Sequence, residues 1–551
     1  MPRRPRKPVG FIVMDRLLAS SASAQQAARS ALRSRRSGEG PRIRFGTDRA
    51  GMTAAARCES LTVGAVSRPT RRIRSVIFDT AVDDLGKQNI VLRGYEMHGA
   101  AFVELSWARP VTPGGARGSI ELRVPTLEVG KMLGFSEPLR RSIAGRPLEA
   151  RSVAETERRE RVLERAQTRI AVCFDDGFVE CGGRRSNFHE IELQLLEGAE
   201  EELWSVAAEL APRAKARLLP MSEAELALAR ATGAGIAPVK GRRPKLAPDA
   251  SLDEAIVATL SACLDQFVAN WPALQCLAPE EAIHQMRVAL RRLRAGVGLL
   301  RRGVASQALE TASARARDIS ATLGAARNLD VLGDMLVAGP LAQANGEPSF
   351  YALLDAVERR RIEAHTTVAA LVAAPQTTQF VIDLRAALAA KNWRPLPDEA
   401  HHPALDPSTP GSAKEFAVRS LDRLHRRAMK KSRDLASLTP EQRHDARIAF
   451  KKARYAAEFF ESLFDAQGKA RRYLRRTSAL QDKLGAFNDL TVAAELLREF
   501  GDAEADLAPA SGFAIGWCAH AREGAAVDWK KTEKSLKTLE AFWRRGAREE
   551  P

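Results

Sequence analysis

Two segments of the sequence carry the same series of basic side chains. Arginine binds phosphate oxygens through two parallel hydrogen bonds, lysine adds a compact positive charge, and histidine becomes cationic when an anion raises its pKa. A row of such side chains is suited to binding a polyanion. The first series is His284, Arg287, Arg291, Arg292 and Arg294, and the second is His444, Arg447, Lys451, Lys452 and Arg454.

Helical periodicity predicts that most of each series shares one face. An α-helix turns about 100° per residue, which places positions 284, 287, 291 and 294 within about 80° of one another. The large apolar residues of this segment fall on a different face, as the buried stripe of an amphipathic helix does. These apolar residues are Met286, Leu290, Leu293, Val297 and Leu300.

The alternative is that both series are ordinary solvated helix faces, in which arginine pairs with an acidic residue four positions away. The local composition argues against this, because residues 284–302 and 446–457 contain no Asp or Glu. Like charges three or four positions apart on a helix repel by roughly a few tenths of a kcal/mol. Because this self-repulsion occurs in both segments, the pattern indicates selection for an anion.

The two series belong to a longer internal repeat. At every position the second series follows the first by 160 residues, from 284 to 444 and from 294 to 454. Further along, Leu323–Leu329 (LGAARNL) is echoed by Leu484–Leu490 (LGAFNDL). Two matched segments in the same order indicate a duplication. Helical periodicity begins after Ser251, and the segment 392–412, rich in Pro and other helix breakers, divides this region into two halves.

The region from about 42 to 200 differs, because its apolar segments are short, rich in β-branched residues and separated by Gly, Pro or Asp. These predicted strands are RIRF, RSVIFDT, IVLRGY, AFVELSW, SIELRV, RIAVCF and HEIELQL. Helices are expected within 197–231. A stretch without periodicity follows at 233–249 and is expected to link two domains.

The expected fold class is therefore α+β with several domains. Residues 1–41 are expected to be a disordered basic extension, because Arg, Ser and Ala dominate there. Residues 42–232 are expected to form an antiparallel β-barrel domain, and 233–249 the linker. Residues 250–545 are expected to form an all-α, duplicated helical-bundle domain with repeats at about 250–391 and 413–545.

The amino-acid composition limits the kinds of ligand that the protein is expected to bind. Lys and Arg number 85 against 68 Asp and Glu, a formal net charge of +17, which favours anionic ligands. No apolar run is long enough to cross a bilayer. The six cysteines form no metal-binding or disulfide-like pattern, which favours a reduced, cytoplasmic protein. Few aromatics accompany the basic faces, which argues against a stacking platform for single-stranded nucleic acid, although nonspecific binding to nucleic acid stays open.

The repeated motifs resemble a CHAD domain, the conserved histidine α-helical domain. The resemblance rests on H-x-x-R-V-x-x-R-R-L-R with L-G-x-x-R-N-L-D, and on their second copies H-x-x-R-I-x-x-K-K-x-R-Y and L-G-x-x-N-D-L. It implies two pseudo-symmetric helical bundles whose basic faces meet in a groove that binds inorganic polyphosphate. It also assigns both basic series to that groove, together with Arg327.

The strand-rich region resembles a CYTH domain, the triphosphate tunnel metalloenzyme fold. This resemblance implies a tunnel in which basic residues hold triphosphate, carboxylates hold a divalent metal and a water attacks. The landmarks are Arg74–Thr80, Leu92–Arg93, Arg117–Glu121, Asp175–Gly177 and Glu190–Leu193. If the roles known for the family apply at these positions, Arg93 and Arg117 bind the triphosphate, and Glu121, Glu190 and Glu192 are the metal ligands.

This region also departs from the CYTH pattern. The family opens with E-x-E-x-K, whereas the first strand here is Arg42–Phe45, with arginines where carboxylates are expected. A late S-K-A-x-R-G-Y pattern survives only as Ser222–Leu228, without its basic residues. Glu190 and Glu192 lie at i and i+2, on one face of a strand, as two ligands would. Their other interpretation is that they take part in buried ion pairs of a degenerate domain.

The sequence thus predicts a cytoplasmic, bacterial polyphosphate-binding protein, associated with polyphosphate granules and needing no cofactor for that binding. The alternative from another class is an enzyme, a metal-dependent inorganic triphosphatase, which would need Mg or Mn in the CYTH-like domain. The third is a nonspecific nucleic-acid binder, whose affinity would fall steeply with salt.

Overall fold

The computed structural model describes most of the chain in separate stretches. They are residues 40–88, 90–97, 99–107, 118–124, 127, 142–165, 167–232, 236–275, 279–343, 347–393, 412–435, 437–464, 467–524 and 529–544. The expectation of a disordered extension falls on residues 1–39, which lie outside this part. Most of the breaker-rich segment 392–412 also lies outside it.

The chain divides into two compact units. Unit 1 extends to Val239 and includes Val268–Pro279 and Val372–Ile382, and unit 2 consists of Lys240–Phe267, Glu280–Leu371 and Asp383–Pro551. Each unit is described by itself. The linker and repeat boundaries predicted from the sequence stay predictions.

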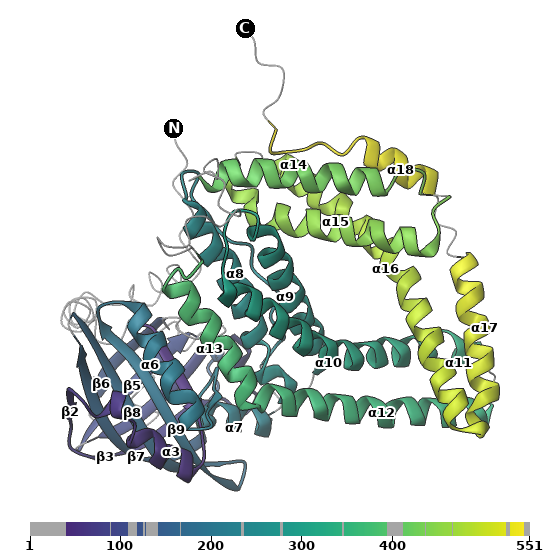
Figure 1. Ribbon diagram of the computed structural model, residues 1–551. Coiled ribbons are helices and arrows are strands. Elements are labelled where there is room, and N and C mark those ends of the chain that lie inside the picture. The colour runs from purple at the N-terminus through teal and green to yellow at the C-terminus, as the bar shows by residue number, and fades with distance from the viewer. Residues whose placement is uncertain are drawn as a thin grey trace. The chain divides into compact units, whose positions relative to one another are not determined.

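Unit 1 is built on one antiparallel sheet of ten strands that curls into a tunnel-like shape (Figure 1). The strand order is β10-β1-β9-β8-β7-β3-β4-β5-β6, with β2 paired to β7. The strands are β1 (Arg42–Gly46), β2 (Ala65–Ser67), β3 (Arg71–Asp79), β4 (Ile90–Met97), β5 (Ala100–Trp107), β6 (Gly118–Val124), β7 (Glu149–Arg165), β8 (Thr168–Cys181), β9 (Arg184–Glu197) and β10 (Arg217–Leu218). Every segment that the sequence predicts as a strand is confirmed, whereas β2, β7 and β10 are additional.

In the described part of unit 1, α3 (Arg49–Ala56), α6 (Glu200–Arg213) and α7 (Glu223–Thr232) accompany this sheet. The acidic residues in the first turn of α6 and of α7 suit the positive end of the helix dipole. Leu203, Trp204 and Leu210 of α6 are fully buried, which fixes this helix against the sheet. The alternation of inward and outward side chains along β1 and β9 places Arg44, Glu190 and Glu192 on one face of the sheet.

Unit 2 is helical, as predicted. Its elements include α8 (Leu252–Ala269), α9 (Pro279–Leu300), α10 (Gln307–Ala338), α11 (Pro340–Gln343), α12 (Pro348–Ala373), α14 (Ala413–Lys431), α15 (Pro440–Phe460), α16 (Gln467–Ala503), α17 (Ala508–Gly524) and α18 (Trp529–Lys537). The helix α13 (Pro375–Ala389) belongs to unit 1 up to Ile382 and to unit 2 from Asp383. The α+β fold class is therefore confirmed. Within unit 2, α14 lies beside α15 and α16 beside α17 (Figure 1).

The duplication is visible in the order of the helices. The first basic series lies in α9 and the first L-G-x-x motif in α10, and the second copies lie in α15 and α16. Local signals begin these helices, since Ser306 caps α10, and Thr439 with Gln442 forms a capping box at α15. One buried cluster unites the ends of α10, α12, α16 and α17, including Leu332, Leu353 and Leu497.

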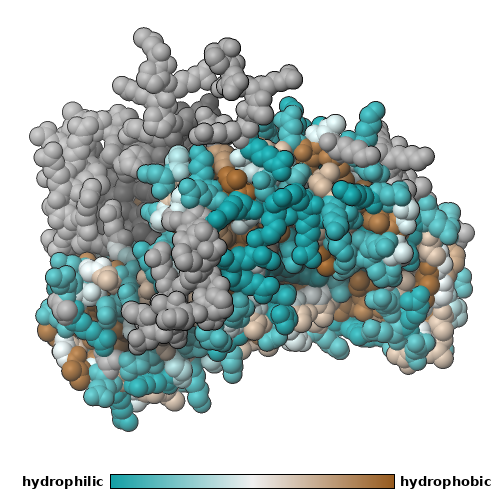
Figure 2. Space-filling view, turned by 45° about the horizontal axis from the view of Figure 1, so that its top comes forward, coloured by the Kyte–Doolittle hydropathy of each residue, from teal (hydrophilic) through white to brown (hydrophobic). Residues whose placement is uncertain are grey.

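The described residues on the face seen in Figure 2 are mainly polar. Figure 2 shows hydrophilic side chains over a broad central area of the visible face, with hydrophobic ones in smaller groups. Within the described part of the chain, no helix combines the length and apolar character needed to span a bilayer.

Candidate functional site

Packing between α9 and α15 brings the two repeats together. The helices approach closely at Gly296, where an added Cβ would lie 3.7 Å from the ring of Phe459. The Arg292 guanidinium lies over the same ring, 5.6 Å from its centroid, and its Nε is 3.8 Å from a carboxylate oxygen of Glu458. These contacts set the alignment of α9 with α15. They therefore determine which residues face one another in the helical turns that precede Arg292 in α9 and Glu458 in α15.

Arg292 therefore differs in position from the rest of its series. It is only 3% exposed, and its two terminal nitrogens donate hydrogen bonds to Gln266 Oε1 at 2.9 Å and to the Arg242 carbonyl at 3.0 Å. A side chain with this burial and these partners holds α9 in place and offers nothing to a ligand in solution. We leave Arg292 outside the binding surface that the sequence predicts.

Four of the predicted residues form a cluster of positive charge, which we call the basic cluster: Arg287 and Arg291 of α9 and Arg447 and Lys451 of α15. All four side chains are half-buried. Among the described residues, none forms an ion pair with any of the four. The basic cluster is thus a group of cations from both repeats without an ion-pair partner among the described residues, and the Asp489 carboxylate offsets only part of its charge.

Electrostatics confirm the proximity of these groups. Burial and the charges of Arg291, Arg447, Arg287 and Arg454 lower the pKa of Lys451 to about 7. Burial and the neighbouring cations, Arg291 first, lower the pKa of Arg287 to about 10. Burial also lowers the pKa of Arg447, with Arg291 adding to the effect and the Asp489 carboxylate opposing it. Like charges in a partly desolvated place destabilise one another in this way.

The repeated L-G-x-x motif positions the two inner arginines. An added Cβ at Gly324 of α10 would lie 3.7 Å from the Arg287 guanidinium, and one at Gly485 of α16 would lie 3.9 Å from Nη2 of Arg447. Arg287 also donates to the Gly324 carbonyl and to Asn328 Oδ1, both at 3.3 Å. Each arginine thus lies against a glycine of the helix that follows it in the same repeat.

The sequence interpretation missed Gly324, Gly485, Asn328 and Asp489 as parts of the site. Asn328 and Asp489 hold equivalent places in the two copies of the motif, one giving Arg287 a neutral acceptor and the other presenting a carboxylate to Arg447. The duplication was the available signal, because these positions lie inside the repeated segments.

The other predicted groove residues lie around the basic cluster or apart from it. The pKa of His284 is lowered by burial and by Arg327, and Arg327 is 3.9 Å from the buried carboxylate of Asp330. Arg454 is paired with Glu458 at 2.6 Å and with Gln481 at 2.9 Å. The remaining three residues either face α10 or are exposed to solvent. They are Arg294, beside Arg317 and Asp318, and the exposed His444 and Lys452.

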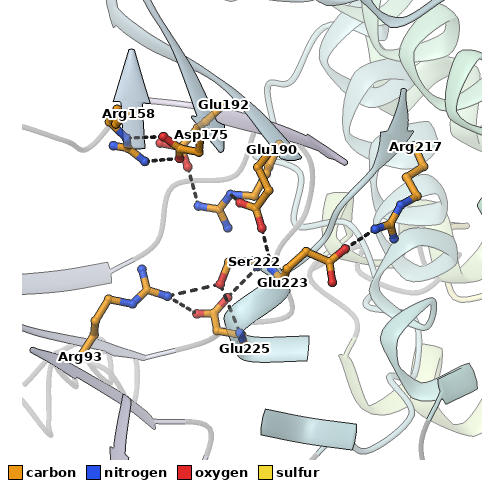
Figure 3. A network of polar contacts seen from close by, with 10 residues as sticks. Arg93, Arg158, Asp175, Glu190, Glu192, Arg217, Ser222, Glu223 and Glu225 are labelled. Carbon is orange, nitrogen blue, oxygen red and sulfur yellow. Dashed lines mark hydrogen bonds and ion pairs between the residues drawn. The ribbon is translucent and has the colours of Figure 1, made fainter. Parts of the chain in front are cut away.

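The second candidate site lies on one face of the unit 1 sheet, where polar side chains from several strands point toward one another (Figure 3). Arg44 of β1 forms ion pairs with both predicted metal ligands, to Glu192 by a short contact and to Glu190 at 3.3 Å. Arg158 binds Asp175 through two hydrogen bonds of 2.7 and 2.6 Å. These groups form one internally paired network of opposite charges.

Residues before and within α7 complete this network. Arg93 lies 3.4 Å from Ser222 Oγ and 3.4 Å from Glu225 Oε1, and the backbone N–H of Glu223 donates to Glu190 at 2.6 Å. Glu121 lies in β6 opposite Glu104 of β5 by backbone register. Arg117 lies outside the described residues.

A divalent metal does not fit this arrangement. Its two best carboxylates, Glu190 and Glu192, already share the Arg44 guanidinium. Among the described residues there is also no group of three or more His, Cys, Asp and Glu side chains placed to hold a metal ion. We therefore derive no catalytic step through a metal in unit 1.

Burial and charge act oppositely on the two carboxylates. Burial raises the pKa of Glu190 to about 7 although Arg44 opposes it, whereas the charges of Arg44, Arg42 and Arg158 outweigh burial and hold the pKa of Glu192 far below its usual range. Between the ordinary glutamate pKa and about 7, the folded state keeps a proton on Glu190 that the unfolded state releases. On this account Glu190 makes unit 1 lose stability as pH rises through that window.

Glutamine substitutions are expected to separate these effects. At pH 8, Glu190→Gln is expected to raise the free energy of unfolding of unit 1 by roughly 3 kcal/mol, and this gain disappears near pH 4.5. Glu192→Gln lowers it at pH 8, because Arg44 loses its closest partner. Calorimetric unfolding of both variants at pH 8 and near pH 4.5 measures the change in the free energy of unfolding that each substitution causes. Equal effects of the two substitutions would show that the Arg44 pairing does not distinguish these carboxylates.

Comparison with known proteins agrees with the duplicated helical region. Residues 258–498 match the model of the CHAD domain, which confirms the resemblance of the C-terminal half. A solved CHAD domain from the plant Ricinus communis is 28% identical, and the match covers 56% of this chain and 99% of that chain with a TM-score of 0.48. A comparison with curated proteins finds no match.

Other solved structures resemble the chain at lower identity. PptA from Streptomyces chartreusis is 17% identical over 52% of this chain and 100% of its own, with a TM-score of 0.39. HpAC1 from Hippeastrum, described as having a dominant triphosphatase activity, is 14% identical over 35% of this chain and 95% of its own, with a TM-score of 0.25.

Proposed function

We propose, on the premise that residues 258–498 form a CHAD domain, that the chain binds inorganic polyphosphate in the basic cluster. The observation that carries the proposal is that α9 and α15 bring Arg287, Arg291, Arg447 and Lys451 together with no ion pair from the described residues. A bound polyanion would remove the mutual repulsion and supply the missing hydrogen-bond acceptors.

The chemistry of the basic cluster favours a flexible phosphate chain over nucleic acid. Guanidinium groups are donors for successive phosphate groups, and both repeats contribute them. Tyr455, the aromatic residue of the second basic series, is 2% exposed and lies beneath the Arg454 guanidinium, 4.9 Å from it. The half-buried Phe487 of α16 is already contacted by the guanidinium groups of Arg443 and Arg522, each 5.8 Å from its centroid. Neither ring is a free platform for stacking on the bases of single-stranded nucleic acid.

Unit 1 has a supporting role in this proposal. Its carboxylates are engaged by Arg44, Arg93 and Arg158, so the proposal assigns it no hydrolysis and treats it as a scaffold. Binding to a storage polymer also agrees with a place in the cytoplasm near polyphosphate granules.

Competition binding tests the function directly. The full chain, holding a fluorescent long-chain polyphosphate at about 150 mM salt, is titrated with unlabelled polyphosphate, duplex DNA or triphosphate at equal total phosphate. This salt weakens nonspecific attraction to charge. We expect polyphosphate to displace the probe at a concentration at least tenfold below that of DNA or triphosphate.

Two outcomes would contradict the proposal. Equal competition by DNA would make the chain a nonspecific polyanion binder. Release of phosphate from triphosphate in the presence of Mn, lost on Glu190→Gln, would favour the triphosphatase alternative and require Arg44 to move away from the carboxylates.

A further inference from the structure

Lys451 has an unusual position for a lysine. Its side chain is half-buried on α15, and its ammonium group has neither an ion pair nor a hydrogen bond within the described residues. Surface lysines normally extend into water, where solvation stabilises the charge. Here the side chain gains little solvation and no counter-charge, so the charged form is costly.

The positive charges that act on Lys451 come from α9 and from α15 itself. From α9 come Arg287 and Arg291, and from α15 itself Arg447 and Arg454 lie one turn before and one turn after it. From α10, Arg327 acts on Arg287 and on His284.

The nearby carboxylates are already engaged. Glu458 is bound by Arg454 at 2.6 Å and faces Arg292 at 3.8 Å. Asp489 of α16 acts on Arg287 and Arg447. Neither carboxylate is an ion-pair partner of Lys451 among the described contacts.

We propose that, above neutral pH, Lys451 is mostly neutral while the basic cluster is empty and takes up a proton when a polyanion binds. The inference rests on the proposed function of the basic cluster and adds its regulation by pH. A polyanion lying against Arg287, Arg291 and Arg447 cancels the repulsion that disfavours the ammonium form, so the amine gains a proton from solvent and becomes one more donor for the ligand. The lowered pKa of Lys451 agrees with this.

The sign of the pH effect follows from linkage. Because binding takes up a proton, affinity falls as pH rises above about 7, by at most about tenfold per pH unit for one proton. Without ligand, the unfolded state binds more protons than the folded state between pH 7 and the ordinary lysine range. Lys451 therefore makes unit 2 gain stability as pH rises through that window, and a bound polyanion removes this gain.

Proton uptake can be measured by isothermal titration calorimetry of the full chain with long-chain polyphosphate in Tris and in HEPES, since the binding enthalpy then differs by the ionisation enthalpy of the buffer. With a pKa of about 7, the native chain is expected to take up most of one proton through Lys451 at pH 8 and much less at pH 6. Lys451→Arg keeps a permanent charge and is expected to bind with that uptake missing at pH 8.

Subtracting the proton uptake of Lys451→Arg from that of the native chain cancels the protons that the ligand and other groups, such as His284, exchange on binding. Equal uptake by both proteins at pH 8, or binding by the native chain without uptake, would overturn the proposal for Lys451 and leave polyphosphate binding intact. Absence of binding by the native chain would instead refute the proposed function. Circular dichroism of Lys451→Arg shows that the comparison is made between folded proteins.

Discussion

Reversal of two charges, Arg291→Glu with Lys451→Glu, is expected to weaken polyphosphate binding by roughly 100- to 10,000-fold at about 150 mM salt. A hydrogen bond to a charged group contributes about 1.5–3 kcal/mol, and about 1.4 kcal/mol corresponds to a factor of ten. The substitutions remove one donor from each repeat and place two carboxylates where the ligand charge would lie. Equilibrium titration with labelled polyphosphate measures the loss.

A matched control separates this local effect from net charge. Arg359→Glu with Lys534→Glu changes the total charge equally, and both residues are exposed and lie outside the basic cluster. Its affinity is expected to stay within about threefold of the native value, since charge beyond the Debye length of about 8 Å is largely screened. Native affinity in the Arg291 and Lys451 variant would place the binding surface elsewhere.

Removal of the Arg44 guanidinium is expected to destabilise unit 1 strongly. Arg44→Met leaves Glu190 and Glu192 buried without their shared partner. An unpaired buried charge costs about 3–5 kcal/mol. For a unit of this size, that lowers the unfolding temperature by roughly 6–20 °C, which scanning calorimetry can measure.

Arg169 offers a matched control on the surface, because it also is an arginine that faces two glutamates. It faces two glutamates, Glu164 at 3.6 Å and Glu197 at 3.9 Å, and its side chain is 46% exposed. Arg169→Met is expected to cost less than about 1 kcal/mol. The triple variant Arg44→Met, Glu190→Gln, Glu192→Gln should recover much of the stability that Arg44→Met loses. Failure to recover it would show that packing, and not unpaired charge, explains the loss.

The strand β7, one of the three that the sequence did not predict, shows the limit of local sequence patterns. β7 has charged side chains at more than half of its positions and no apolar alternation, a composition more typical of an exposed helix. In the structure its charges meet partners from elsewhere in the chain. Arg158 binds Asp175, Glu160 faces Arg68 at 2.8 Å, and Arg161 donates to the carbonyl of Ala56 at 2.7 Å. Because these partners are distant in sequence, periodicity alone could not identify them.

The candidate site was predictable to the extent that it depends on helical repetition. Duplication and helical spacing gave Arg287, Arg291, Arg447 and Lys451, which the structure brings together. The same reasoning included Arg292, which lies about 100° around the helix from Arg291. Its environment is set by Gln266 and Glu458 from other helices, and no spacing within α9 reports on them.

In unit 1 the departures from the CYTH pattern were visible in the sequence, but their mutual compensation was not. Arginine stands in the first strand where carboxylates were expected, and acids stand in Ser222–Leu228 where bases were expected. The structure brings the two segments together, since Arg44 binds Glu190, the backbone N–H of Glu223 donates to that same carboxylate, and the Glu225 side chain adds negative charge near Arg44. The pairing of β1 with β9 in the folded sheet is needed to show that the first strand and Ser222–Leu228 belong to one network.

The contacts between arginine and glycine in the two repeats have an evolutionary consequence. Arg287 meets Gly324, and Arg447 meets Gly485, each wholly within one repeat. One repeat alone thus contains a complete half of the basic cluster, and a second identical molecule could have supplied the other half. This favours an ancestor that assembled the site as a symmetric homodimer before the gene fused to its own copy. Once both halves were on one chain, Asn328 and Asp489 were no longer constrained to be identical, and the site could lose its symmetry.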